Sequence, residues 1–229
     1  MLNNKKVEII LPAYNESKSI KKYIHDLENL NLFDKIVVIN NNSTDSTRKE
    51  VLKTSAIYLE EKKQGYGAAV KRGLRNVTSE IIFISEPDGS FKSSDILKMI
   101  KHMDNFDVIF TTRTNSKMKF YLKFGNKIYG FFISILFGGP FLSDVGSSLK
   151  LIKAEAITDI INNLKFDGPE LQMELTISLL KKKLRIKEIE INYQNRTGRK
   201  SVYSKNFFTS FRVFLAFTKV VFFKFFRIL

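Results

Sequence analysis

The stretch Ile81-Ile82-Phe83-Ile84-Ser85-Glu86-Pro87-Asp88-Gly89-Ser90-Phe91 places two carboxylates directly after an apolar run. Ile81–Ile84 has the uniformly apolar character of a strand that is buried on both faces. The Asp88-Gly89 pair is also a common turn signal, in which case Glu86 would lie in solvent. Two acids alone do not make a metal site. The stretch therefore predicts a buried strand that ends in either a turn or a cation site.

Similar apolar runs recur along the first half of the chain, with helical spacing between them. The predicted strands are Val7–Leu11, Lys35–Ile39, Ile57–Leu59, Ile81–Ile84 and Asp107–Thr111. The predicted helices are Ser17–Leu30, Ser46–Thr54, Gly65–Arg75 and one that begins at Ser94-Asp95. Alternating buried strands and helices predict an α/β fold, with a mostly parallel sheet and helices on both faces.

The second half has fewer strand signals. Ser143–Ile152 leads into a helix from Ala154, and Gly168-Pro169-Glu170 opens a helix that runs through Leu180. Arg185–Ile191 alternates as an edge strand does. Phe120–Phe137 is aromatic and apolar, and core packing is its expected role, with an apolar surface contact as the alternative.

Composition limits the classes of protein that fit. A chain of 229 residues with 44% hydrophobic content can bury one sizeable core. The chain has no cysteine, which excludes disulfides and thiolate metal sites and fits a reducing compartment. The opening MLNNKKVEIILPAYNES has too short an apolar segment for a signal peptide.

The net charge of +15 is concentrated near the end of the chain. From Lys181 to Leu229 there are thirteen Lys and Arg residues against two Glu, and nine of the 21 phenylalanines lie in Asn206–Leu229. A basic, phenylalanine-rich tail suggests binding either to nucleic acid or to an anionic membrane. No nucleic-acid fold motif is present, so nucleic acid is the less favoured partner.

Drawn as a helix, Lys205–Leu229 separates its cations from its phenylalanines. The cationic side carries Lys205, Thr209, Arg212, Lys219 and Arg227, and the opposite side carries Phe207, Phe211, Phe214, Val221, Phe222 and Phe225. This amphipathic pattern predicts a membrane-associating interfacial helix, with a membrane span as second choice and a docked core helix as the alternative. We divide the chain accordingly into a domain at 1–203 and a tail at 204–229.

The polar clusters follow the predicted strands, and ligands of such sheets bind at the carboxyl ends of the strands. Asn40–Asp45 is dense in residues that cap helices, and it could equally contact the hydroxyls and base of a nucleotide. Gly65-Tyr66-Gly67 could cradle a phosphate at a helix N-terminus, although it lacks the third glycine of a dinucleotide site. The sequence predicts one site at this edge of the sheet.

In this order, the motifs LPAYNES, VVINNNSTDST, GYGAAVKRGL, SEPDGSF, TTRTN and SDVGSSLKLI resemble the family 2 glycosyltransferases of the Rossmann-like GT-A fold. The resemblance is strongest to the dolichyl-phosphate-mannose-synthase-like branch and runs from about Val7 to Ser201. A nucleotidylyltransferase would carry a glycine-rich, arginine-containing loop after the first strand, and LPAYNES is not such a loop.

The resemblance implies a role for each matching position. The nucleotide-sugar site would comprise Pro12, Tyr14, Asn15, Glu16, Asn41, Asn42, Asp45, Gly65 and Gly67. A divalent cation, Mg²⁺ or Mn²⁺, would be held by Glu86, Asp88 and Ser90, with Glu86 in place of the family's first aspartate. The acceptor site would comprise Arg113, Arg196, Lys200 and Ser201, with Lys150 where an arginine is usual. The catalytic residues would be Asp88, Asp144 and Arg113.

The acceptor decides whether a general base is needed. A hydroxyl must lose a proton as it attacks, whereas a lipid phosphate is already anionic and needs charge and alignment. Asp144 is the candidate base, with an alternative role of holding Ser147 or Ser148. Glu174 is a weaker candidate that would more naturally form part of the acceptor wall. His25 and His102 lie outside the motifs and are expected to be structural.

The sequence therefore predicts a metal-dependent, inverting enzyme that transfers a sugar from a UDP- or GDP-sugar to a polyprenyl phosphate. We expect it to be peripheral on the cytoplasmic face of a membrane and to contribute to a cell-envelope glycan. The alternatives are transfer to a hydroxyl of a glycan or lipid, or a non-catalytic basic protein that binds membranes or nucleic acid. The sequence leaves the oligomeric state open.

Overall fold

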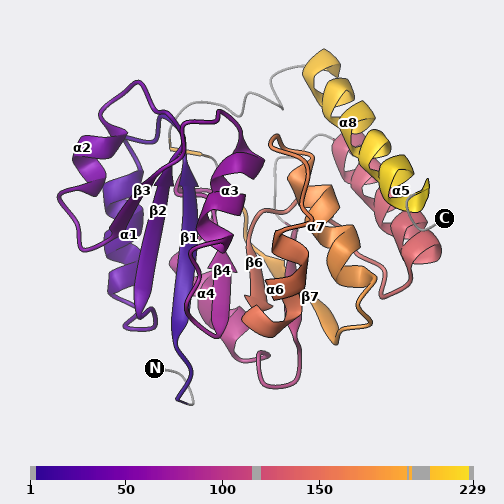
Figure 1. The fold of residues 1–229 in the computed structure, drawn as a ribbon, viewed down its shortest axis with the longest axis horizontal. Coiled ribbons are helices and arrows are strands. Elements are labelled where there is room, and N and C mark those ends of the chain that lie inside the picture. Colours follow the sequence, from indigo (N-terminus) through magenta and orange to yellow (C-terminus); the bar gives the residue numbers. More distant parts are fainter. Residues whose placement is uncertain (1–3, 115–119, 195, 198–206, 227–229) are drawn as a thin grey trace.

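A computed structural model of the chain describes residues 4–114, 120–194, 196–197 and 207–226. Its centre is one seven-stranded sheet in the order β3-β2-β1-β4-β6-β5-β7 (Figure 1). The strands are β1 Val7–Ala13, β2 Lys35–Asn40, β3 Ile57–Glu60, β4 Ile81–Ile84, β5 Val108–Arg113, β6 Lys150–Lys153 and β7 Ile186–Ile191. Every strand expected from the sequence is present, and β7 is at an edge as predicted.

The sheet is mostly parallel, which confirms the predicted fold class. β1 pairs in parallel with β2 and β4, β2 with β3, and β5 with β7. β6 runs antiparallel between β4 and β5, and Lys150 at its start is opposite both Ile84 and Phe110. This reversal brings the loop before β6 beside the carboxyl ends of β4 and β5, where the functional motifs lie.

Helices cover both faces of the sheet, again as predicted. One face packs against α1 (Ile20–Glu28), α2 (Thr47–Val51) and α4 (Ser93–Ile100). The other packs against α3 (Tyr66–Leu74), α6 (Ala154–Ile161) and α7 (Leu171–Leu180). Because both faces are buried, the central strands read as continuous apolar runs rather than as alternating ones.

The strand before the acidic pair shows how firmly this core is held. All four residues of β4 are buried, and Phe83 makes an edge contact with Phe33 at a ring separation of 5.5 Å. Replacing such a buried phenylalanine by alanine typically costs about 3–5 kcal/mol. The strand therefore provides a rigid support for Glu86 and Asp88.

Two long helices lie side by side at the end of the molecule remote from β3 (Figure 1). They are α5 (Phe120–Phe137) and α8 (Phe207–Phe226). The Tyr129 hydroxyl of α5 is 2.7 Å from the Phe214 carbonyl oxygen of α8, and Phe217 and Val220 of α8 are buried. The predicted boundary at 203/204 lies outside the described residues, so the division into domain and tail stays a prediction.

The outer sides of α5 and α8 are apolar and exposed. Only part of Phe120–Phe137 packs in the core as expected, through Tyr129, Ile133 and Phe137. The exposed large apolar side chains of the two helices are Phe120, Phe124, Phe131, Phe132, Ile135, Leu136, Phe211, Phe214, Leu215, Phe222, Phe225 and Phe226. Among the described residues, no helix combines the length and the apolar character that crossing a bilayer requires.

Candidate active site

A cleft of about 560 Å³ opens at the carboxyl ends of the strands and brings together motifs from distant parts of the chain. The predicted site residues that line it are Pro12, Tyr14, Asn15, Glu16, Asn41, Gly65, Glu86, Arg113 and Arg196. The cleft lining does not include Asn42, Asp45, Gly67, Asp88, Ser90 or Asp144. Lys200 and Ser201 lie outside the described residues.

Asn15 ties the first motif to the second. It adopts a left-handed backbone conformation with φ 57°, and its Oδ1 accepts hydrogen bonds from the backbone N–H groups of Thr44 (2.8 Å) and Asp45 (3.2 Å). Asp45 in turn accepts hydrogen bonds from the backbone N–H groups of Ser17 and Thr47. Asp45 therefore serves as a turn residue directly before α2, one of the roles that the sequence left open.

Asn41 lines the cleft but uses its side chain to hold the loop before α3. Its amide nitrogen donates to the carbonyl oxygens of Glu61 (3.2 Å) and Lys63 (2.7 Å). Its Oδ1 accepts from the backbone N–H of Gly65 (2.7 Å) and from Gln64 (3.2 Å). The side chain shapes the cleft wall, because its donors and acceptor are already engaged.

The two glycines of the GYG motif allow α3 to approach a neighbouring loop. Gly65 has φ +145°, and a Cβ there would collide with the carbonyl oxygen of Asp167. A Cβ on Gly67 would lie 2.7 Å from the carbonyl oxygen of Phe166. Only glycine permits this backbone at this distance. The contact explains both glycines, and the phosphate role of this turn stays a prediction.

Glu16 is a carboxyl group with altered acidity inside the cleft. Burial raises its pKa to about 7, the nearby charge of Asp88 adds to the rise, and a hydrogen bond from Ser19 opposes it. A carboxyl that holds its proton near neutral pH can donate a hydrogen bond, which an ionised one cannot. When protonated, Glu16 can therefore donate a hydrogen bond to a hydroxyl oxygen of a bound ligand.

The acidic pair after β4 is covered by an arginine from the far end of the chain. Arg196 Nη2 lies 2.6 Å from Oε2 of Glu86, and its Nε lies 2.9 Å from Oδ2 of Asp88. Oδ1 of Asp88 accepts the backbone N–H of Ser90 at 2.9 Å. Burial and the charge of Glu86 raise the pKa of Asp88, while Arg196 opposes the rise. Glu86 is thus paired rather than left in solvent.

The oxygen atoms at this position fit a hard divalent cation. Oδ2 of Asp88 is close to Arg196 but lacks the alignment of a hydrogen bond, and Oγ of Ser90 is likewise buried without a hydrogen-bond partner among the described residues. Buried oxygens that accept no hydrogen bond are costly unless a ligand or a charged group compensates them. The described residues contain no group of three or more His, Cys, Asp and Glu arranged around a metal. A cation here would therefore take its other ligands from a bound diphosphate and water.

Arg113 and Asp144 form a bidentate pair beside the cleft. Arg113 Nε is 2.5 Å from Oδ2 of Asp144, and Nη2 is 2.7 Å from Oδ1, which also accepts from Asn126 at 2.6 Å. The guanidinium also lies over the ring of Tyr193 at 5.2 Å. Because both oxygens of Asp144 are engaged, its observed role is to orient Arg113 rather than to hold Ser147 or Ser148 through its side chain.

Lys150 reaches the cleft wall through a chain of hydrogen bonds. Its ammonium is fully buried, donates to the carbonyl oxygen of Ser147 and lies 2.5 Å from Oε1 of Gln172. The amide of Gln172 donates to the Tyr66 hydroxyl at 2.6 Å. Burial lowers the pKa of Lys150 to about 7, against the raising effect of Asp144. Lys150 is a supporting residue behind the cleft.

Sequence reasoning missed several lining residues. They are Ala13, Gln64, Tyr66, Ala69, Pro87, Gly146, Ser148, Gln172 and Tyr193. Tyr193 follows β7, so the rule that ligands bind at the carboxyl ends of strands could have indicated it. Gln172 carries no such signal because it lies in α7.

The remaining candidates have structural roles. His25 is on the exposed side of α1, 2.7 Å from Glu28, and His102 lies against the ring of Phe106. Neither histidine lines the cleft, as expected. Glu174 is completely buried and accepts the backbone N–H groups of Lys165 and Phe166. It therefore holds a loop and does not form part of the cleft wall.

Most of the chain matches a known protein family. Residues 8–210 match the family model described as Glycosyl transferase family 2. The chain belongs to this family, since the match spans most of its length.

Two relatives by sequence agree with this placement, and a solved structure shares the fold. The chain is 28% identical over 217 residues to a UDP-N-acetylglucosamine–dolichyl-phosphate N-acetylglucosaminyltransferase of Methanococcus voltae, covering 82% of this chain and 85% of that protein. It is 27% identical over 220 residues to a dolichyl-phosphate beta-glucosyltransferase of Trichomonas vaginalis, covering 85% and 67%. The fold is similar to glucosyl-3-phosphoglycerate synthase of Mycobacterium tuberculosis in complex with Mn²⁺, UDP and glucosyl-3-phosphoglycerate, with a TM-score of 0.74, 16% identity and coverage of 95% and 80%.

Proposed function

We propose that the protein is a metal-dependent glycosyltransferase that moves a sugar from a nucleotide-diphosphate sugar to a polyprenyl phosphate, with inversion at the anomeric carbon. Family membership and two relatives named for transfer to dolichyl phosphate support the choice of reaction. The contribution to a cell-envelope glycan belongs to the same proposal, as does the choice between a UDP- and a GDP-sugar.

The donor is assigned to the cleft. Pro12, Tyr14, Asn15 and Glu16 line one wall, and the α3 N-terminus with Gly65 lines another. Glu86, Asp88 and Ser90 would hold Mg²⁺ or Mn²⁺, which would neutralise charge on the departing diphosphate. The structural neighbour holds Mn²⁺ and UDP, which supports a cation and a nucleotide in this fold.

The observation that carries the acceptor assignment is a pair of guanidinium groups in the same cleft as Glu86. Arg113 and Arg196 both line it, and no histidine does so among the described residues. Both oxygens of Asp144, the candidate base, are engaged by Arg113. An acceptor phosphate suits this arrangement, because it is anionic without a base and is attracted by the positive charge of the guanidinium groups. One phosphate oxygen would form the new bond to the anomeric carbon as the nucleoside diphosphate leaves.

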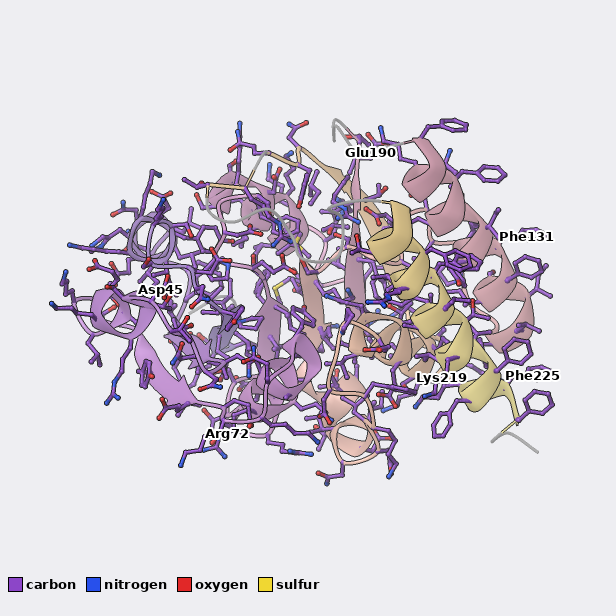
Figure 2. The ribbon with its side chains drawn as sticks, turned by 90° about the horizontal axis from the view of Figure 1, so that it is seen from above. Asp45, Arg72, Phe131, Glu190, Lys219 and Phe225 are labelled. Atoms are coloured by element: carbon purple, nitrogen blue, oxygen red, sulfur yellow. The ribbon has the colours of Figure 1, made fainter. Side chains whose placement is uncertain are left out.

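The membrane is the proposed partner of the apolar surface of α5 and α8. Phe131 and Phe225 project from the same edge of the molecule, with Asp45 at the opposite end (Figure 2). Neither helix contains an acidic residue, and Arg212 and Lys219 are exposed on α8. An apolar surface with flanking cations suits peripheral binding to an anionic bilayer, on the cytoplasmic face, where a lipid phosphate can be reached.

A direct assay tests the function. Nucleotide sugars are first screened by thermal unfolding with and without Mn²⁺, since a ligand that binds the folded state raises the midpoint. The stabilising donor is then offered with a polyprenyl phosphate or with the matching polyprenol. We expect transfer to the phosphate alone. Equal transfer to the polyprenol would favour a hydroxyl acceptor instead, and a donor that never binds would remove the enzymatic proposal.

A further inference from the structure

The contact between Arg196 and the acidic pair has a consequence for cation binding. Asp88 is 1% exposed and does not line the cleft, whereas Glu86 and Arg196 do. The Arg196 guanidinium lies within 2.9 Å of an oxygen of each carboxylate. A cation that enters from the cleft would therefore find the guanidinium already in contact with the carboxylate oxygens that would bind the cation.

We propose that Arg196 takes the place of the divalent cation in the donor-free protein, so that arginine and cation bind Glu86 and Asp88 in a mutually exclusive way. This inference rests on the proposed cation site. Oε2 of Glu86 and Oδ2 of Asp88 are both the natural cation ligands and the atoms that contact the guanidinium. Two positive groups cannot share these oxygens, because like charges at such separations repel strongly in a partly buried site.

Backbone hydrogen bonds hold the segment around Arg196 in place, so its side chain could move without moving the segment. The backbone N–H of Gln194 donates to the carbonyl oxygen of Ser90 at 2.9 Å, and that of Thr197 donates to the carbonyl oxygen of Asp88 at 2.8 Å. These bonds fix the chain on either side of Arg196. A Cβ on Gly89 would overlap the hydroxyl of Thr197, so this turn lies directly against the segment. The flexible side chain can leave the carboxylates without undoing these contacts.

Displacement would give the reaction an order. The diphosphate of the donor brings negative charge together with the cation. This charge would attract the released Arg196 guanidinium toward the cleft. Arg113 already lines that cleft, so the released guanidinium would add a second positive charge beside an acceptor phosphate. Donor and cation therefore bind before the acceptor.

The test measures Mn²⁺ binding without turnover, from the electron paramagnetic resonance signal of free Mn²⁺. The wild type is compared with Arg196→Ala, with Asp88→Asn and with the double variant, in the absence of nucleotide. We expect Arg196→Ala to bind Mn²⁺ at least about tenfold more tightly than the wild type, and Asp88→Asn to remove this gain. Arg113→Ala is the control, because Arg113 lines the same cleft but pairs with Asp144 rather than with Glu86 or Asp88. Its smaller effect on Mn²⁺ affinity measures the loss of one positive charge from the cleft.

The outcomes separate this inference from the function it rests on. If Asp88→Asn abolishes Mn²⁺ binding but Arg196→Ala binds no more tightly than the wild type or Arg113→Ala, the cation site stands and mutual exclusion is wrong. If Asp88→Asn leaves Mn²⁺ binding unchanged, the cation site itself is wrong. Should Arg196→Ala fail to fold, the Nε–H resonance of Arg196 in the wild type decides. It should shift on saturation with Mg²⁺ and UDP, and an unchanged resonance would overturn the inference.

Discussion

Lys224 of α8 lies 3.1 Å from the carboxylate of Glu174, which is completely buried in α7. Removing one partner of a buried ion pair commonly costs about 3–5 kcal/mol, because the other charge is left uncompensated. Deleting α8 would also uncover Phe217 and Val220. Truncation therefore tests folding together with membrane binding, and substitutions on the exposed side of α8 provide the cleaner experiment.

The first prediction concerns that exposed side. Phe131→Ser, Phe222→Ser and Phe226→Ser together should weaken binding to anionic liposomes at least about tenfold, since each phenylalanine loses buried apolar area in the lipid. Transfer to a long-chain acceptor should fall with it, and transfer to a short-chain acceptor should change little. Liposome flotation and both assays provide the measurement.

The control for this prediction replaces exposed apolar residues elsewhere. The double variant Leu52→Ser, Leu97→Ser removes two such side chains. Leu52, directly after α2, is 62% exposed, and Leu97 of α4 is 43% exposed. Equal loss of liposome binding in the control and in the phenylalanine variant would exclude α5 and α8 as the membrane surface.

The second prediction concerns the acidic pair. Asp88→Asn should lower transfer by at least about a hundredfold in a protein that still folds, because the buried Oδ2 would no longer carry charge for a cation. Glu86→Gln should have the smaller effect, since Glu86 lines the open cleft and water can take its place. Full transfer by Asp88→Asn would rule out the metal assignment.

The third prediction separates donor from acceptor. Alanine at Arg113 or Arg196 should reduce turnover with a lipid phosphate at least about a hundredfold, without a comparable loss of donor affinity. Arg113→Lys should restore turnover only in part, because lysine cannot form the bidentate pair with Asp144. Isothermal titration with the donor and steady-state kinetics with the acceptor make the comparison. A matching loss of donor affinity would assign these arginines to the nucleotide site.

The fourth prediction uses two glycines of one helix. A Cβ on Gly130 would overlap the carbonyl oxygen of Leu142, whereas a Cβ on Gly125 meets nothing within 4 Å. Gly130→Ala should lower the free energy of unfolding by at least about 2 kcal/mol through this overlap. Gly125→Ala should raise it by about 0.5–1 kcal/mol, because alanine favours the helix. Denaturant unfolding measures both, and equal effects would contradict the packing of α5 on the 142 loop.

The fifth prediction concerns pH and Lys150. The unfolded chain binds the lysine proton below its usual pKa of 10.5, whereas in the folded protein burial lowers that pKa to about 7. Between these values the unfolded state binds more protons, so this residue makes the free energy of unfolding rise with pH. Lys150→Met should remove that contribution, giving a smaller slope between pH 7 and 9 in denaturant unfolding. The same slope in both proteins would show that the lysine is not buried as described.

The sequence by itself determined the framework of the fold. Ile81–Ile84 and the other apolar runs predicted their strands because a strand buried on both faces must be apolar at every position. Placing the polar motifs after those strands predicted a single site, and the cleft contains residues from each of the motifs LPAYNES, VVINNNSTDST, GYGAAVKRGL and SEPDGSF. The basic, phenylalanine-rich pattern also predicted the helix at Phe207–Phe226. These features depend on local periodicity and composition, which a sequence carries directly.

Tertiary structure alone decided which side chains are partners. Arg196 pairs with Glu86 from 110 residues away, and Arg113 at the end of β5 pairs with Asp144 in the loop that precedes the antiparallel strand β6. A periodic pattern gives the face on which a residue lies, but not what covers that face. For this reason the core position expected for α5 holds for only part of the helix, and the pairing of both Asp144 oxygens with Arg113 was not predicted. Such partnerships depend on charge and packing between segments distant in sequence, and they exist only once the chain has folded.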